Sequence, residues 1–204
     1  MHSKVVCVFR SGGDYRPEHV QRLQAMVHRF VGSKHEFVCL SDQPIRGVPT
    51  EPMRRNWPGW WAKLELFEHF QKAFYLDLDT TLLANIDDVV GYRHVFTMLR
   101  DLGKPTIPAS GVMAWDGDFS GIAETFAEDV EANIKACSSA NRWGDQGFIA
   151  QHINPEFLQD LFPGAVASYK WQVLRHGLKP EQRIVCFHGK PRPWEVKELD
   201  VIHG

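Results

Sequence analysis

The chain has 204 residues, which suits one domain with a sizeable core and leaves too little for a second full domain. Hydrophobic residues make up 44% and charged residues 24%, as in an ordinary soluble globular protein. The net charge of −2 gives no overall basic field that would favour nucleic acid or an anionic membrane. No signal peptide is evident, and no segment approaches the roughly 20 apolar residues that cross a bilayer. We therefore expect a cytoplasmic protein without stable membrane insertion.

Cysteine spacing and local charge narrow the possibilities further. The cysteines are far apart without paired-ligand spacing, so buried, reduced thiols are expected at Cys7, Cys39, Cys137 and Cys186. Charge is uneven over residues 170–192, where Glu181 accompanies six basic residues: Lys170, Arg175, Lys179, Arg183, Lys190 and Arg192. This segment is either a solvated surface or a wall that faces phosphate groups.

Strands and helices alternate in the first part of the chain. Val5–Phe9 is a continuous apolar run that ends at Ser11-Gly12-Gly13-Asp14, which predicts a buried strand followed by a loop. Pro17 then begins a helix with apolar residues at helical spacing up to Phe30. Glu36–Leu40 predicts a second strand. A strand, a helix and a strand in so short a span imply a parallel α/β unit with a right-handed crossover.

The rest of the chain continues the alternation, which defines an α/β domain. We expect a loop over 44–59, a buried strand over 73–76, and between them a helix over 60–71 whose apolar face holds Trp60, Leu64, Phe67 and Phe70. Residues 92–102 fit a helix or a strand. Further on we expect a strand over 110–115, a helix over 121–137, a short helix from Asn154-Pro155 to Leu161, and strands over 166–174 and 184–187.

The sequence Tyr75-Leu76-Asp77-Leu78-Asp79 carries the strongest chemical signal. In a strand, side chains two residues apart lie on one face, so both carboxylates are expected to point the same way. They follow a buried strand, and open α/β sheets bind ligands at the carboxyl ends of their strands. Two neighbouring carboxylates repel each other and lose hydration, and a bound cation relieves both penalties. We therefore predict a cation site at Asp77 and Asp79.

Three further segments accompany this Asp-x-Asp motif: Trp60-Trp61-Ala62-Lys63-Leu64-Glu65-Leu66-Phe67, Gly144-Asp145-Gln146-Gly147-Phe148 and Phe187-His188-Gly189-Lys190-Pro191-Arg192-Pro193-Trp194. In this order, over residues 4–194, they resemble glycosyltransferases of the GT-A fold, particularly family 8, which includes glycogenin and bacterial lipopolysaccharide galactosyltransferases. The resemblance implies a single GT-A (Rossmann-like) nucleotide-sugar-binding domain over 1–204, with a mixed, mostly parallel sheet flanked by helices. Its nucleotide-binding half would cover about residues 1–90, and its acceptor and catalytic half about 91–204.

The resemblance also implies a donor and a metal ion. The donor is a nucleotide-diphosphate sugar, expected to be a UDP-sugar. Asp77 and Asp79 match the Asp-x-Asp whose cation bridges the two donor phosphates, and His188 matches the late histidine that is the third protein ligand. Mixed oxygen and imidazole ligation suits Mn²⁺ better than Ca²⁺, which prefers oxygen only, and Mg²⁺ is the alternative.

The other expected site residues follow from the same resemblance. Asp145 and Gln146 match the Asp-Gln pair beside the transferred sugar and are the expected catalytic residues. Lys190 matches the lysine that contacts the diphosphate, although its interval from the histidine is shorter here and Arg192 is the alternative. The expected donor contacts are Arg10, Tyr15, Lys63, Asp77, Ser110, Gly111, Gly189, Lys190 and Arg192, with Tyr15 available to stack on the base.

Glycosyl transfer also requires that water be kept from the donor. Tryptophan-rich loops at Trp57–Trp61 and at Trp194 could cover the site, although core packing is the expected role of Trp60. The acceptor stays open: a carbohydrate is favoured, and a protein or a modified nucleic-acid base is also compatible.

Two other functions compete with this interpretation. Asp77-Leu78-Asp79-Thr80-Thr81 resembles the first motif of haloacid-dehalogenase-like phosphatases, in which the first Asp is the nucleophile. That motif normally follows the first strand of its domain, and the nearest acidic pair for its magnesium site is Asp116-Gly117-Asp118, in an expected loop. The second alternative is a protein that binds a nucleotide sugar without turnover, against which the intact Asp77, Asp79 and His188 argue.

Overall fold

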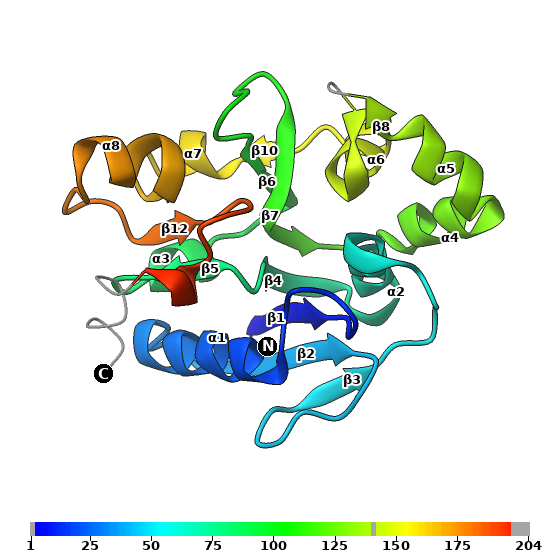
Figure 1. Ribbon diagram of the computed structural model, residues 1–204, viewed down its shortest axis with the longest axis horizontal. Coiled ribbons are helices and arrows are strands. Elements are labelled where there is room, and N and C mark those ends of the chain that lie inside the picture. Colours follow the sequence, from blue (N-terminus) through cyan, green and yellow to red (C-terminus); the bar gives the residue numbers. More distant parts are fainter. Residues whose placement is uncertain (1–2, 140–141, 197–204) are drawn as a thin grey trace.

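The computed structural model describes residues 3–139 and 142–196. Its main sheet has seven strands in the order β10-β6-β7-β4-β1-β2-β3 (Figure 1). These strands are β1 Ser3–Phe9, β2 His35–Ser41, β3 Thr50–Pro52, β4 Lys72–Leu76, β6 Phe96–Arg100, β7 Pro108–Asp116 and β10 Glu156–Phe157. β7 runs antiparallel to β4 and β6, and every other pair is parallel. The predicted mixed, mostly parallel α/β fold is confirmed, and residues 92–102 contain strand β6.

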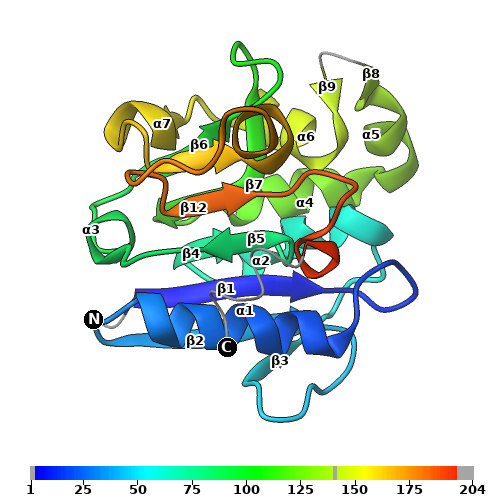
Figure 2. The same ribbon diagram turned by 60° about the vertical axis from the view of Figure 1, so that its left-hand side comes forward.

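Helix α1, Pro17–Phe30, connects β1 to β2 and lies along one face of the sheet (Figure 2). Proline suits its first position because the ring fixes φ and no helical hydrogen bond needs that N–H. Val20 and Val27 of α1 pack with Val5 in one core cluster, whereas Val6 packs in the cluster on the opposite face. Both faces of β1 are therefore buried, which explains its unbroken apolar sequence.

The opposite face of the sheet is covered by η1 (Gly59–Glu65), α2 (Leu66–His69), α4 (Ser120–Glu128), α5 (Val130–Ala136) and α6 (Gly144–His152). The expected helix over 60–71 is instead the 3₁₀ helix η1 followed by one turn of α-helix. With three residues per turn, Trp61, Leu64 and Phe67 line up and are buried. Trp60, expected in the core, is 55% exposed.

The expected helix over 121–137 is two helices, α4 and α5. They are divided at Asp129, whose φ of −154° and ψ of 86° leave the helical region. Its side chain accepts a hydrogen bond from the amide of Ala132 (3.0 Å) and so caps α5. The local capping preference of aspartate overrides the apolar periodicity that runs through both helices.

A second, three-stranded sheet has the order β11-β12-β5, with β5 at Thr80–Leu82, β11 at Val166–Ser168 and β12 at Ile184–Cys186. The strand expected over 166–174 ends early, because the Ser168 Oγ accepts from the amide of Trp171 (3.1 Å) and starts the π-helix η2, Tyr169–Val173. The remaining elements are α3 (Asp87–Val90), β8 (Ser138–Ser139), β9 (Arg142–Trp143), α7 (Leu158–Leu161), α8 (Leu174–His176) and η3 (Pro193–Glu195). The short helix expected from Asn154 begins only at Leu158, after β10.

Two further expectations concern the cysteines and the membrane. All four cysteines are buried and free, as predicted. Over residues 3–139 and 142–196, no helix combines the length and the apolar character needed to span a membrane.

Candidate active site

The Asp-x-Asp motif lies in the turn between β4 and β5. β4 ends at Leu76, and a hydrogen bond from the amide of Thr80 to the carbonyl of Asp77 (3.0 Å) closes the turn. The expectation that both carboxylates extend from one strand is therefore wrong. Because the chain turns between them, Asp77 and Asp79 contact different partners, although they stay close enough for the charge of Asp77 to raise the pKa of Asp79.

Asp77 belongs to a buried network around Lys63. The Lys63 Nζ lies 3.0 Å from Asp77 Oδ1 and 3.1 Å from Asp145 Oδ2, and its side chain is 6% exposed. It also donates to Ser110 Oγ (3.0 Å), which donates to Asp145 Oδ2 (2.6 Å). Burial alone lowers the pKa of Lys63, but Asp145 and Asp77 more than offset this and raise it, so the amine is charged at neutral pH. Gln146, half-buried, follows Asp145 in α6.

A bulge in β7 presents two of the predicted residues to this network. Met98 of β6 pairs with Met113, but the next residue, Leu99, pairs with Ala109, so residues 110–112 of β7 have no partner in β6. Bulges re-aim side chains and recur beside active sites. Here the bulge brings Ser110 to Lys63 and the backbone of residue 111 to Asp77, whose amide donates to the Gly111 carbonyl (2.9 Å).

Asp79 lies in a second network with Tyr15 and Arg192. The Tyr15 hydroxyl donates to Asp79 Oδ2 (3.0 Å), and Arg192 Nη1 contacts the same oxygen and lies 2.9 Å from the tyrosine hydroxyl. The guanidinium also lies over the Tyr15 ring, 4.9 Å from its centroid. Tyr15 was expected to stack on the donor base, and Arg192 covers one face of its ring. The Arg192 Nε is buried and has no hydrogen-bond partner among the described residues.

The two aspartates fit a divalent cation. The pKa of Asp79 is raised to about 7, by burial first and then by the negative charge of Asp77, against the opposing charge of Arg192. More positive charge nearby would relieve that penalty. The described side-chain contacts of Asp77 fall on Oδ1 and those of Asp79 on Oδ2, so each carboxylate keeps its other oxygen for a further ligand. Mn²⁺ and Mg²⁺ take carboxylate oxygens of this kind.

His188 follows β12 and contacts a different group. Its Nε2 lies 2.6 Å from Ser168 Oγ, and its carbonyl accepts from Lys170 Nζ (2.6 Å). Partial desolvation, and then the charge of Lys170, lower the pKa of the imidazole, which favours the neutral form that binds metals. Within the described residues, no three His, Cys, Asp or Glu side chains are grouped closely enough to hold a metal ion. His188 as the third ligand stays a prediction.

The loop after β12 sends one basic side chain into the site. Arg192 reaches Asp79, whereas the Lys190 Nζ pairs with Glu195 (2.7 Å) and its side chain is 70% exposed. Gly189 has a φ of +83°, and a Cβ there would lie 3.1 Å from Lys170 Nζ. Of the two candidates for the diphosphate contact, the geometry favours Arg192.

Arg10 lies at the carboxyl ends of β1 and β2, where open α/β sheets bind nucleotides. Its Nε is 3.9 Å from Asp42 Oδ2, and its guanidinium donates to Asn56 Oδ1. Asp42 also accepts from the amide (3.1 Å) and hydroxyl (2.6 Å) of Ser11. These contacts hold the loop that begins at Arg10 against the end of β2.

Sequence reasoning missed Tyr75 and Ser168. The Tyr75 hydroxyl donates to Asp77 Oδ1, and its ring lies 5.1 Å from Lys63 Nζ. Period-two spacing before Asp77 is a signal that could have identified this tyrosine. Ser168, which contacts His188, comes from a segment that no local pattern marks. Asp14, 3.4 Å from Arg192 Nη2, belongs to the loop from Arg10 to Tyr15, which the family resemblance places at the nucleotide base.

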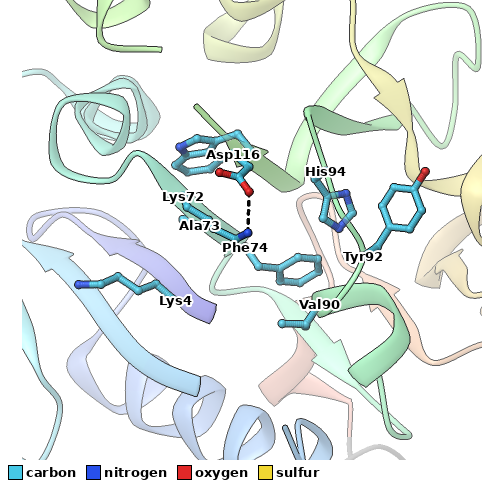
Figure 3. Close-up of a pocket in the computed structure, with 9 residues that line it drawn as sticks. Lys4, Lys72, Ala73, Phe74, Val90, Tyr92, His94 and Asp116 are labelled. Atoms are coloured by element: carbon cyan, nitrogen blue, oxygen red, sulfur yellow. Dashed lines mark hydrogen bonds and ion pairs between the residues drawn. The ribbon is translucent and has the colours of Figure 1, made fainter. Parts of the chain in front are cut away.

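A small cavity lies at the other end of the sheet (Figure 3). Its volume is about 20 Å³, room for about one water molecule, and Lys4, Lys72, Tyr92 and His94 are among its lining residues. Lys72 is the first residue of β4, whereas Asp77 follows the last. This cavity is therefore separate from the Lys63 and Asp79 networks and too small for a sugar nucleotide.

The solved structures that resemble this chain include several glycosyltransferases. The structure of the glycosyltransferase GlyE from Streptococcus pneumoniae TIGR4 matches with a TM-score of 0.72 and 14% identity, over 99% of this chain and 59% of GlyE. The bifunctional glycosyltransferase WbbM matches with a TM-score of 0.66 and 11% identity, over 98% of this chain and 49% of WbbM. The galactosyltransferase LgtC, in complex with donor and acceptor sugar analogues, matches with a TM-score of 0.61 and 10% identity, over 98% of this chain and 94% of LgtC.

No protein-family profile matches the sequence, and no curated protein sequence is significantly similar to it. The structural similarity extends over nearly the whole chain, so the chain has the α/β fold of these GT-A-like glycosyltransferases. It spans 59% of the length of GlyE and 49% of that of WbbM. Membership of family 8 stays a prediction.

Proposed function

We propose that the protein is a glycosyltransferase that takes its sugar from a nucleotide-diphosphate donor, a UDP-sugar, with a divalent cation at Asp77 and Asp79. The observation that carries this proposal is the buried Lys63 network, which joins the Asp-x-Asp turn to Asp145 at the carboxyl end of β4. Charged groups are costly to bury, so natural structures keep such clusters mostly where function requires them. Here the cluster lies in a glycosyltransferase fold at the edge where such sheets bind ligands.

Transfer breaks the bond between the anomeric carbon and a donor phosphate oxygen, and forms a bond to the acceptor oxygen, whose proton is released. When bound, a divalent cation acts as a Lewis acid toward the departing diphosphate. Arg192, which contacts Asp79, adds positive charge on the same side.

Lys63 and Ser110 fix Asp145 for a contact with the donor sugar. Both donate to its Oδ2 and so fix the orientation of the carboxylate, while Oδ1 stays available for the sugar. A carboxylate held in this way needs little reorganisation when the sugar departs. Such preorganised groups stabilise the charge that develops in the transition state. Removal of the Asp145 carboxylate is therefore expected to lower turnover.

The acidic pair that the phosphatase alternative was expected to use, Asp116 and Asp118, does not lie beside Asp77. Asp116 ends β7 and pairs with Lys72 (2.6 Å), and these two residues face each other at the amino end of β4. The length of β4 separates this pair from Asp77. Asp116 and Asp118 therefore do not complete a magnesium site around Asp77.

Thermal melts with UDP, with and without Mn²⁺, test the proposal. At a concentration near 100 times its dissociation constant, a ligand adds about 2.7 kcal/mol of stability, which raises the melting temperature of a domain of this size by roughly 5–10 °C. We expect this shift only with Mn²⁺, and its loss in Asp77→Asn. Asp116→Asn, an exposed aspartate at the other end of the sheet, serves as the matched control. Equal shifts with Mn²⁺ and with chelator would contradict the metal dependence.

Mass spectrometry of donor hydrolysis tests the reaction itself. Wild type is incubated with Mn²⁺ and a panel of nucleotide sugars, and we expect release of UDP from at least one UDP-sugar. In parallel, intact protein is weighed after mixing with sugar phosphates. A covalent phosphate adduct on Asp77, without donor hydrolysis, would establish the phosphatase in place of the transferase.

A further inference from the structure

Trp60 is a large apolar side chain that the core does not use. It is 55% exposed, whereas its neighbours Trp57 and Trp61 are each 5% exposed and pack against Phe126. Exposed apolar residues are common on protein surfaces, so exposure alone carries no functional meaning. The position of Trp60 relative to the candidate site does.

The indole of Trp60 is seated against the backbone just before Asp145. Gly144 has a φ of +63°, and a Cβ there would lie 3.2 Å from the Trp60 Nε1, so a side chain at 144 would displace the ring. Trp60 also precedes Lys63 by one turn of η1, and Lys63 pairs with Asp145. Trp143, on the other side of Gly144, is 53% exposed. One exposed indole therefore lies against the residue that precedes Asp145, and a second belongs to the residue before that.

We propose that Trp60, with Trp143 beside it, forms the acceptor subsite, and that the acceptor is a saccharide whose ring stacks on the exposed indole. This inference rests on the proposed transferase function. A pyranose has an apolar face of C–H groups and a rim of hydroxyls, so one molecule matches both an indole face and a nearby carboxylate. Indole offers a large, rigid contact surface at little entropic cost.

The charges in this corner favour a neutral ligand. Binding of nucleic acid depends on several cations that contact phosphates. Here the charge of Lys63 is neutralised by its ion pairs with Asp77 and Asp145. Arg142, next to Trp143, is exposed and is a single cation. An uncharged, hydroxylated ring therefore suits the site better than a polyanion.

A glycan array tests the subsite. The full chain, with Mn²⁺ and UDP, is applied to immobilised oligosaccharides that include lactose, maltose and cellobiose, and to single-stranded oligonucleotides. We expect wild type to bind a set of saccharides and Trp60→Ala to lose about tenfold or more of its affinity, as for truncation of a central tryptophan anchor. Trp60→Phe, which keeps a smaller stacking face, is expected between the two. Tyr92→Ala, an exposed aromatic at the other end of the sheet, is the control and should bind like wild type.

Two results would overturn the subsite: wild type that binds no saccharide or only the oligonucleotides, and Trp60→Ala that binds saccharides as wild type does. Melting temperatures of all variants show that the exposed substitution leaves the protein folded. Donor hydrolysis, measured on the same wild-type preparation, separates the two proposals. Saccharide binding that depends on Trp60, without hydrolysis of any nucleotide sugar, refutes the transferase and with it the acceptor role, and leaves Trp60 as part of a saccharide-binding site. Hydrolysis by wild type with saccharide binding independent of Trp60 refutes the subsite alone.

Discussion

Lys63→Met removes the cation that holds two carboxylates in the interior, and should destabilise the protein strongly. Removing one partner of a buried ion pair costs about 3–5 kcal/mol, because the other charge stays buried without compensation. Asp145 is 9% exposed and Asp77 31%, so water can solvate Asp77 and the cost falls at the lower end, about 3 kcal/mol. For a domain of this size we expect a fall of roughly 6–12 °C in melting temperature.

Thermal melts of metal-free protein measure this effect, and the chain offers a matched control. Lys72 pairs with Asp116 at 2.6 Å, but both side chains are nearly half exposed, so Lys72→Met should cost about 1 kcal/mol or less. In the double variant Lys63→Met/Asp145→Asn, one of the two carboxylates left without Lys63 is also removed, and we expect part of the lost stability to return. Equal losses in the two lysine variants, with an additive double variant, would refute the idea that Lys63 neutralises this cluster.

Three further predictions concern the proposed reaction and its metal. Asp145→Asn should lower kcat by about 100-fold and leave UDP affinity nearly unchanged, because contacts made only in the transition state affect turnover; a fully active variant in steady-state kinetics would remove Asp145 from the site. His188→Ala should abolish Mn²⁺-dependent donor hydrolysis while the melting temperature is maintained, and a variant with unchanged activity would exclude His188 as a ligand. Arg192→Gln should bind Mn²⁺ alone about tenfold more tightly, because a competing cation is removed from Asp79. Electron paramagnetic resonance of free Mn²⁺ measures this, with Arg183→Gln, whose side chain pairs with Asp88, as the control, and equal affinities would contradict competition.

The sequence by itself determined the α/β class, from the alternation of its main strands and helices, and the place of the chemistry. The apolar run Val5–Phe9 predicted a buried strand, and the run over 73–76 predicted that Asp77 follows the end of another. These features are local: the spacing of the apolar residues, and the turn-forming residues that follow each apolar run, indicate a strand or a helix without reference to tertiary contacts. The α/β fold was therefore predictable.

Tertiary structure decided the geometry within that frame. Trp60 and Trp61 are neighbours of the same residue type, and the sequence does not distinguish them. In the 3₁₀ helix η1, Trp61 points into the core and Trp60 stays exposed near Asp145. Likewise, no local pattern brings Arg192 to Asp79, because the two are separated by more than half of the chain. Sequence periodicity reports the face on which a residue lies, whereas contacts between distant segments depend on how the faces pack, and the buried charges at this site are balanced only by such contacts.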